Sequence, residues 1–103
     1  MVKKAQKEIV CIAQFTAKEG KENELIKSLH VLMKPTHKEK GCIRYELNQG
    51  IENPRLITFV EKWASRKIFD KHCAMPYIED YFENVAPKLV ELQVVTLYKE
   101  ILP

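Results

Sequence analysis

The order of apolar and polar residues divides this chain into segments with two different periods. Apolar side chains alternate with others, as is typical of β-strands, over residues 8–16, 42–49, 56–63 and 90–101. Between these runs apolar residues recur at helical spacing, from residue 25 to 33 and from residue 68 to 85. The order strand, helix, two strands, helix, strand predicts a ferredoxin-like βαββαβ fold. This is an α+β domain with one antiparallel sheet and helices on one face.

Glycine and proline residues mark where the predicted helices begin and end. Pro35 is expected to break or kink the first helix, with one more turn over residues 36–40 that Gly41 stops. Ser65 is the predicted N-cap of the second helix, because its hydroxyl can accept a hydrogen bond from the first turn. The last helical piece is expected to end at Ala86-Pro87.

The first strand carries apolar side chains on both of its faces. Alternation places Ile9, Cys11, Ala13 and Phe15 on one face, opposite Val10 and Ile12. Helices on one side of a sheet leave the other face uncovered, and an uncovered apolar face favours association or ligand binding. We therefore expect a homodimer, most simply with two-fold symmetry.

The third strand and the helix after it carry the strongest candidates for chemistry. Phe59, Glu61 and Trp63 lie on one face of the strand, and a carboxylate between two aromatic rings is unusual for a purely structural face. His72 projects from the apolar side of the following helix, which brings an acid and an imidazole toward one pocket. Further candidates for the wall of this pocket are Tyr45, Tyr81 and Phe82.

Each candidate has a chemical and a structural interpretation. His72 is interpreted as a general base or hydrogen-bond donor to a substrate hydroxyl, with a buried structural histidine as the alternative. Glu61 either bonds to His72 and fixes its tautomer or pairs with Arg44 or Arg66 at an interface between subunits, and the structural role is favoured. For the aromatic residues of the third strand, a core position is favoured over a ligand wall.

Composition narrows the classes of function. The 103 residues suit one domain with a core from about residue 8 to 101, and a net charge of +3 is too small to indicate nucleic acid. The longest apolar run, residues 9–13, is too short to span a membrane, and Met1-Val2-Lys3-Lys4 is not followed by the apolar region of a signal peptide. Three separated cysteines without a C-x-x-C motif indicate reduced thiols, so we expect a cytoplasmic protein.

Several short motifs occur along the chain in a characteristic order. They are Glu39-x-Gly41-Cys42 followed by Tyr45, then Asn53-Pro54, Glu61-x-Trp63-x-Ser65, His72 and Pro76. In this order they resemble the antibiotic-biosynthesis monooxygenase (ABM) family of dimeric α+β barrels, over residues 9–98. The resemblance implies that two sheets pack face to face in a dimer. It also implies a pocket in each subunit between its sheet and its helices.

The branches of this family differ in their cofactors. The haem-degrading branch does not fit, because His72 stands where it has a catalytic Trp and Phe82 where it has a haem-ligating His. The branch that processes phospho-autoinducer-2 is closer, with a His at the place of His72 and a Pro and an aromatic residue as in Pro76-Tyr77. The other histidines have no cysteine or carboxylate at ligand spacing, and no glycine-rich loop is present. Neither a metal nor another cofactor is therefore predicted.

The residues and the resemblance together favour a cofactor-independent monooxygenase acting on a small quinol- or polyphenol-like substrate. In this hypothesis His72 deprotonates the substrate, whose anion reacts with O2, and the aromatic candidates shape the pocket. The first alternative is an isomerase for a phosphorylated sugar-like ketone, which needs a cationic site from Arg44, Arg66 or Lys71. The second is a non-catalytic ligand-binding or stress protein of the same fold.

Overall fold

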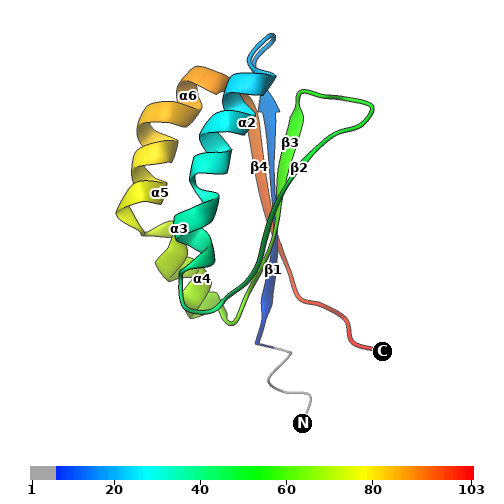
Figure 1. The fold of residues 1–103 in the computed structure, drawn as a ribbon. Helices are drawn as coiled ribbons and strands as arrows, with labels where there is room; N and C mark the ends of the chain where they lie inside the picture. The colour runs from blue at the N-terminus through cyan, green and yellow to red at the C-terminus, as the bar shows by residue number, and fades with distance from the viewer. Residues whose placement is uncertain (1–6) are drawn as a thin grey trace.

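Four antiparallel strands form one sheet in the computed structural model, which describes residues 7–103 (Figure 1). The strands are β1 (Ile9–Ala17), β2 (Cys42–Gln49), β3 (Leu56–Trp63) and β4 (Val90–Tyr98). They follow the order β2-β3-β1-β4, so β1 pairs with β3 on one side and with β4 on the other. This arrangement confirms the predicted ferredoxin-like α+β fold. Residues 1–4, used above in the signal-peptide argument, lie outside the described residues.

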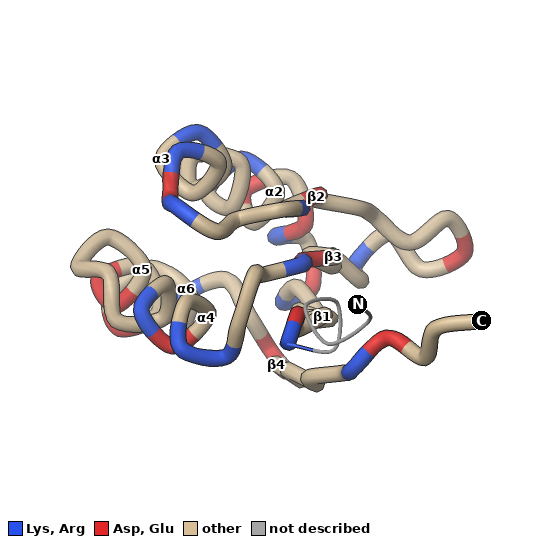
Figure 2. The backbone as a smooth tube through the Cα atoms, turned by 90° about the horizontal axis from the view of Figure 1, so that it is seen from below, with Lys and Arg blue, Asp and Glu red and all other residues tan. Residues whose placement is uncertain are grey.

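All the helical segments cover the same face of this sheet. They are α2 (Glu22–Val31), α3 (Met33–His37), α4 (Arg66–Cys73), α5 (Pro76–Asp80), the π-helical segment η1 (Tyr81–Val85) and α6 (Ala86–Leu89). Figure 2 shows the strands in their sheet order, with every labelled helix on one side. Helices α2 and α3 pack against β3 and β2, whereas α4 and α6 pack against β3 and β4. The space between the sheet and the helices is therefore where a pocket can form.

Pro35 divides the first helical region, as predicted, but the break falls earlier in the chain. Helix α2 ends at Val31, and α3 begins two residues later. Proline has no N–H to donate to the carbonyl of Val31, four residues earlier, and its ring crowds that carbonyl. Helix α3 then ends at His37, so the predicted extra turn over residues 36–40 is shorter than expected.

The second helical region is longer than the sequence pattern indicates. Ser65 caps α4 as predicted, because its Oγ accepts a hydrogen bond from the Ile68 N–H at 3.2 Å. The predicted end at Ala86-Pro87 is wrong, since the chain continues into α6. The Ala86 N–H donates to the carbonyl of Tyr81, five residues earlier, and this wider π-type turn lets Pro87 occupy the first turn of α6.

The helices cover one face of the sheet and leave the other face exposed. On the helical face the side chains of Phe15, Phe59 and Trp63 are at most 1% exposed. On the opposite face, where no helix packs, Leu92 and Tyr98 of β4 are 57% and 51% exposed. The last strand ends at Tyr98, short of the predicted residue 101, and its outer face remains apolar.

Two further expectations from the sequence concern the state of the cysteines and the length of the helices. All three cysteines are free, with Cys11 buried and Cys73 exposed. Within residues 7–103, no helix combines the length and the apolar character that crossing a membrane requires.

Candidate active site

The candidate active-site pocket, called the active-site pocket below, lies between the helical face of the sheet and the helices α4, α5 and η1, with a volume of about 180 Å³. Its strand side comes from β1, β2 and β3, and its rim includes Gln93 and Val95 of β4. Val95 faces the helical side of the sheet yet is 46% exposed, so the pocket opens beside β4. The side chains that define this pocket chemically are Cys11, Tyr45, Phe59, Glu61, His72, Cys73 and Phe82.

Most of the residues predicted from the sequence meet in this pocket. Five of the seven line it, namely Tyr45, Phe59, Glu61, His72 and Phe82. Trp63 does not line the pocket but lies fully buried behind His72, with ring centroids 4.3 Å apart. Tyr81 faces a different cavity between the helices, where its hydroxyl oxygen lies 2.7 Å from Ser28 Oγ.

His72 sits in the last turn of α4 and is 5% exposed. Its Nδ1 donates to the carboxylate oxygens of Glu39, at 3.2 and 3.1 Å. Because a carboxylate only accepts, Nδ1 carries the proton and Nε2 presents its lone pair, which has no hydrogen-bond partner among residues 7–103. Burial lowers the pKa of His72, and the bond and charge of Glu39 oppose this effect. A neutral imidazole at physiological pH therefore faces the pocket.

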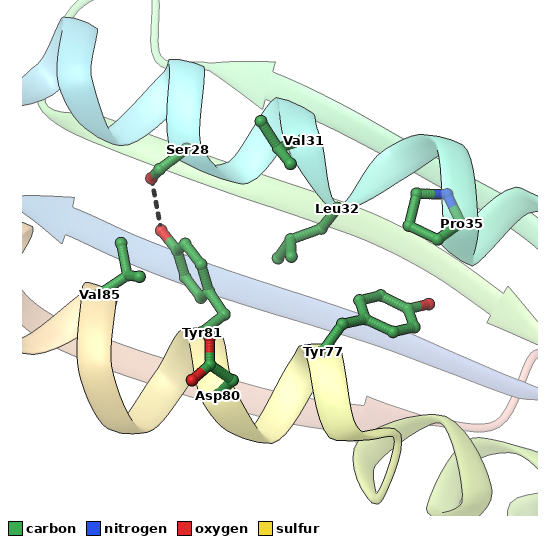
Figure 3. A pocket seen from close by; sticks show the side chains of 8 residues that line it. All are labelled: Ser28, Val31, Leu32, Pro35, Tyr77, Asp80, Tyr81 and Val85. Carbon is green, nitrogen blue, oxygen red and sulfur yellow. Dashed lines mark hydrogen bonds between the residues drawn. The ribbon is translucent and has the colours of Figure 1, made fainter.

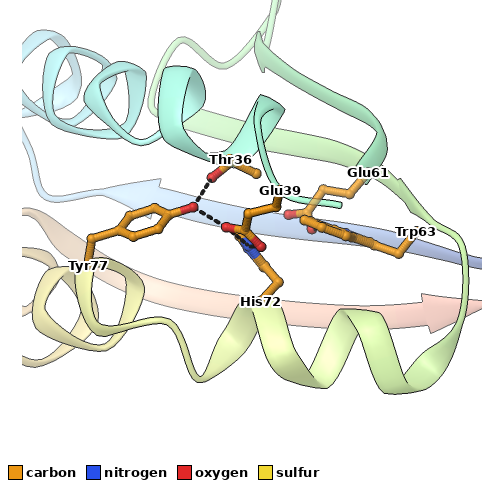
Figure 4. Close-up of polar contacts among 6 residues, drawn as sticks. All are labelled: Thr36, Glu39, Glu61, Trp63, His72 and Tyr77. Carbon is orange, nitrogen blue, oxygen red and sulfur yellow. Dashed lines mark hydrogen bonds and ion pairs between the residues drawn. The ribbon is translucent and has the colours of Figure 1, made fainter. Parts of the chain in front are cut away.

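The contact of Glu39 with His72 is a part of the candidate site that the sequence pattern did not predict (Figure 4). Glu39 lies in the turn between α3 and β2, and its carboxylate also accepts a hydrogen bond from the Tyr77 hydroxyl. Thr36 Oγ1 lies 3.0 Å from the same hydroxyl oxygen, so Thr36, Tyr77, Glu39 and His72 form one chain of hydrogen bonds. The Tyr77 hydroxyl thereby holds the Glu39 carboxylate against Nδ1 of the imidazole, and Thr36 contacts that hydroxyl in turn.

Glu61 occupies the pocket without bonding to His72. Its Oε1 accepts from the indole Nε1–H of Trp63 at 2.9 Å, so the predicted Glu61–His72 hydrogen bond is not formed. Both side chains project from the same face of β3, two residues apart, and this spacing brings them together. Burial raises the pKa of Glu61 to about 7, while hydrogen bonds from Trp63 and Cys11 oppose the shift. Near neutral pH this carboxyl group exists in both protonated and ionised forms.

The arginines predicted as alternative partners of Glu61 are engaged elsewhere. Arg44 pairs with Glu46 at 2.9 Å, and Arg66 pairs with Asp70 at 3.0 Å. None of the described residues that line the active-site pocket is a lysine or arginine. Within residues 7–103, the pocket therefore offers an anionic ligand no lysine or arginine partner.

Aromatic rings form the walls of the pocket. Tyr45 and Phe59 stack with ring centroids 4.3 Å apart, and Phe82 stacks on Phe15 at 5.8 Å. Burial raises the pKa of Tyr45, with the charge of Glu61 as a smaller cause, so its phenol stays neutral. Flat apolar walls beside one neutral imidazole suit a planar molecule that carries a hydroxyl group.

A ferredoxin-like sheet with a pocket beneath its helices places the chain in the class of small α+β pocket proteins. The antibiotic biosynthesis monooxygenase family matches residues 8–84, and the chain belongs to this family. The matched segment contains Glu39, Glu61 and His72, whereas β4 lies beyond it.

Two relatives show how far the similarity extends. The crystal structure of protein SO0527 from Shewanella oneidensis is 48% identical, covers 92% of this chain and 92% of that chain, and has a TM-score of 0.90. The protein named "Putative monooxygenase Rv0793" from Mycobacterium tuberculosis is 28% identical over 89 residues, 86% of this chain and 87% of its own. The structure of Rv0793 matches with a TM-score of 0.83 at 26% identity, covering 93% of this chain and 97% of that chain.

Proposed function

We propose that this protein is a cofactor-independent monooxygenase that oxidises a small quinol- or polyphenol-like substrate. The observation that carries the proposal is the arrangement of His72, which lines an aromatic pocket and binds Glu39 through Nδ1, while Nε2 has no hydrogen-bond partner among residues 7–103. The family description supports the reaction class, as does the name of the Mycobacterium tuberculosis relative.

The first step is removal of a proton from a substrate hydroxyl by Nε2 of His72. Burial keeps the pKa of His72 below its ordinary value, so the imidazole is neutral and able to accept a proton. When it does, the carboxylate of Glu39 stabilises the imidazolium through the Nδ1–H bond. Tyr77 holds the carboxylate in place during this change.

The resulting phenolate is electron-rich and reacts with O2. One oxygen atom enters the ring and the other leaves as water, so a quinol and O2 give a hydroxyquinone and water. The substrate supplies all the electrons in this balance, and no separate reductant takes part. Glu61, whose pKa burial raises to about 7, lines the same pocket, and in this proposal it gives a proton to the departing oxygen.

The isomerase alternative has less support from this pocket. A phosphorylated substrate calls for a cationic site, and none of Arg44, Arg66 and Lys71 lines the pocket. A non-catalytic binding protein also needs a pocket, but the Glu39–His72 hydrogen bond would have no function in it. Activity measurements distinguish both alternatives from the monooxygenase proposal.

The test is oxygen consumption with a panel of reduced quinones and catechols, run beside a panel of phosphorylated sugars. His72→Ala should lower turnover by about 10²–10⁴, the usual loss for one general base. The matched control is His30→Ala, since His30 is an exposed histidine of α2 outside the pocket. Circular dichroism checks that both variants stay folded. Wild-type turnover in a folded His72→Ala protein would refute the role of the imidazole.

A further inference from the structure

A second cavity, the helix groove, lies between α2–α3 on one side and α5–η1 on the other (Figure 3). Its volume of about 350 Å³ exceeds the 180 Å³ of the active-site pocket and is of the size that small ligands occupy. The apolar surface of the groove comes from Val31, Leu32, Pro35, Tyr77, Tyr81 and Val85. Tyr81 and Val85 are the two ends of the π-helical segment, a type of turn that is frequent at functional sites.

The polar groups of the helix groove determine which charge a ligand can carry there. The Tyr81 hydroxyl is already bonded to Ser28 and the Tyr77 hydroxyl to Thr36 and Glu39, so the two tyrosines offer ring faces. Asp80 is the charged residue among the described lining. One of its oxygens accepts from Asn84 at 2.7 Å. Ring faces beside a carboxylate attract a cation and repel an anion.

Tyr77 connects the helix groove to the residues that position His72. Its ring lines the helix groove, and its hydroxyl donates to the carboxylate of Glu39, which in turn binds Nδ1 of His72. The Tyr77 ring and the group that positions the imidazole are therefore joined by one hydrogen bond. Val31, at the groove wall, is 69% exposed, which leaves apolar surface available to such a molecule.

We propose that the helix groove is a second binding site, for a small apolar ring compound carrying an amine, and that its occupant alters the hydrogen bonding of His72 through Tyr77 and Glu39. Binding of the amine in the helix groove does not depend on the reaction proposed above. Its effect on turnover does rest on that proposal, because it requires His72 to act as the base. The ring of the ligand packs on Tyr77 and Tyr81, and its ammonium group faces Asp80.

The probe is 2-phenylethylamine, a single ring with an ammonium group at neutral pH. Its counterpart, 3-phenylpropionate, carries the same ring with a carboxylate. Backbone amide resonances of residues along the groove, such as Val31 and Val85, should shift with the amine and not with the acid. An equal response to both compounds, or shifts confined to the active-site pocket, would overturn the proposal.

A matched pair of variants separates the two cavities. Val31 lines the helix groove and Val95 lines the active-site pocket, and both side chains are substantially exposed. Val31→Arg places a bulky cation in the groove and should abolish the amine-induced shifts, while basal turnover is unchanged. Val95→Arg should leave those shifts intact. The reverse pattern would place the amine in the active-site pocket.

The coupling is tested by Tyr77→Phe, which keeps the ring and removes the hydroxyl that reaches Glu39. In the wild type, 2-phenylethylamine should move the imidazole nitrogen shifts of His72 and the midpoint of its titration. In Tyr77→Phe the amine should still bind, but His72 should no longer respond. A His72 that does not respond in the wild type with the groove occupied would overturn the coupling. None of these readouts needs turnover, so they stand apart from a failure of the monooxygenase proposal.

Discussion

At the scale of single residues, Glu39 sets the state of His72 from outside the pocket wall. Glu39→Gln can still accept a hydrogen bond from Nδ1 but removes the negative charge that opposes the effect of burial. The pKa of His72 should therefore fall further, and the acid limb of the kcat/KM profile against pH should move to lower pH. A control is Glu79→Gln, an exposed acid of α5. An unmoved acid limb in Glu39→Gln would show that the carboxylate does not act on His72.

Glu61 should make the stability of the protein depend on pH. Its native pKa of about 7 lies above the ordinary 4.5, so between these values the native state keeps a proton that the unfolded chain has lost. Stability should therefore fall as pH rises through this window, by about 3 kcal/mol in total. Glu61→Gln does not titrate and should be more stable, relative to the wild type, at pH 8 than at pH 4. Urea unfolding of both proteins at the two pH values measures the difference, and a constant difference would contradict the prediction.

Pocket residues can be predicted from the sequence where they lie on regular strands or helices. Strand alternation is enough to place Phe59 and Glu61 on the helical face, and helical spacing is enough to point His72 toward them. Glu39 lies in an irregular turn, where no period predicts the direction of a side chain; the one local signal is Gly41, which reverses the chain beside it. The prediction for Tyr81 is wrong because Tyr81 and its neighbour Phe82 project from different sides of a helix and line different cavities.

At the scale of elements, Gly41 sets the distance between the α3–β2 turn and helix α4. Its φ is +88°, and a Cβ there would lie 2.5 Å from Ile68 Cδ1. Gly41→Ala should therefore cost more than the roughly 1–2 kcal/mol of a left-handed alanine. It should also lower turnover, because Ile68 lies one helical turn before His72.

The control for this prediction is Gly20→Ala. Gly20 has a similar φ of +78°, but a Cβ there meets nothing within 4 Å. It should show the conformational cost alone and leave turnover unchanged. Urea unfolding compares the two variants, and equal losses of stability would mean that Ile68 moves aside without cost.

Element boundaries follow less directly from the sequence than element order does. Pro35 and Pro87 are both helix breakers by composition, yet one divides a helix and the other lies inside a helical region. The difference comes from the π-type turn before Pro87, where the Ala86 N–H bonds five residues back. Such a turn depends on packing against the sheet, which a local pattern does not contain.

At the scale of the whole molecule, the uncovered face of the sheet supports the proposed homodimer. Val94 lies on this outer face and Val95 on the helical face, with exposures of 44% and 46%. A charge inside a buried dimer interface is costly. Val94→Lys should therefore give a 12.1 kDa monomer, whereas Val95→Lys should remain a dimer. Light scattering at micromolar concentration measures both masses, and a monomeric wild type would rule the dimer out.

The strand topology was predictable because the apolar pattern of each strand fits the position of that strand in the sheet. Two-sided apolar character in β1 fits its interior position in the sheet, and one-sided alternation in β2 fits an edge. The placement of the pocket mouth was not predictable, since it depends on which part of the sheet the helices leave uncovered. In the structure that part is the segment of β4 around Val95, which remains exposed on the helical face.

The place of β4 in the sheet also affects how a substrate reaches the pocket. This edge strand pairs with β1 alone and joins residues far apart in the chain, such as Val10 and Tyr98, so its loop closure costs more entropy than that of the β2–β3 hairpin. Brief detachment of β4 would widen the opening beside Val95 and leave the other strands paired. Amide hydrogen exchange should therefore be faster in β4 than in β3. Equal protection of the two strands would indicate that substrate enters without this opening.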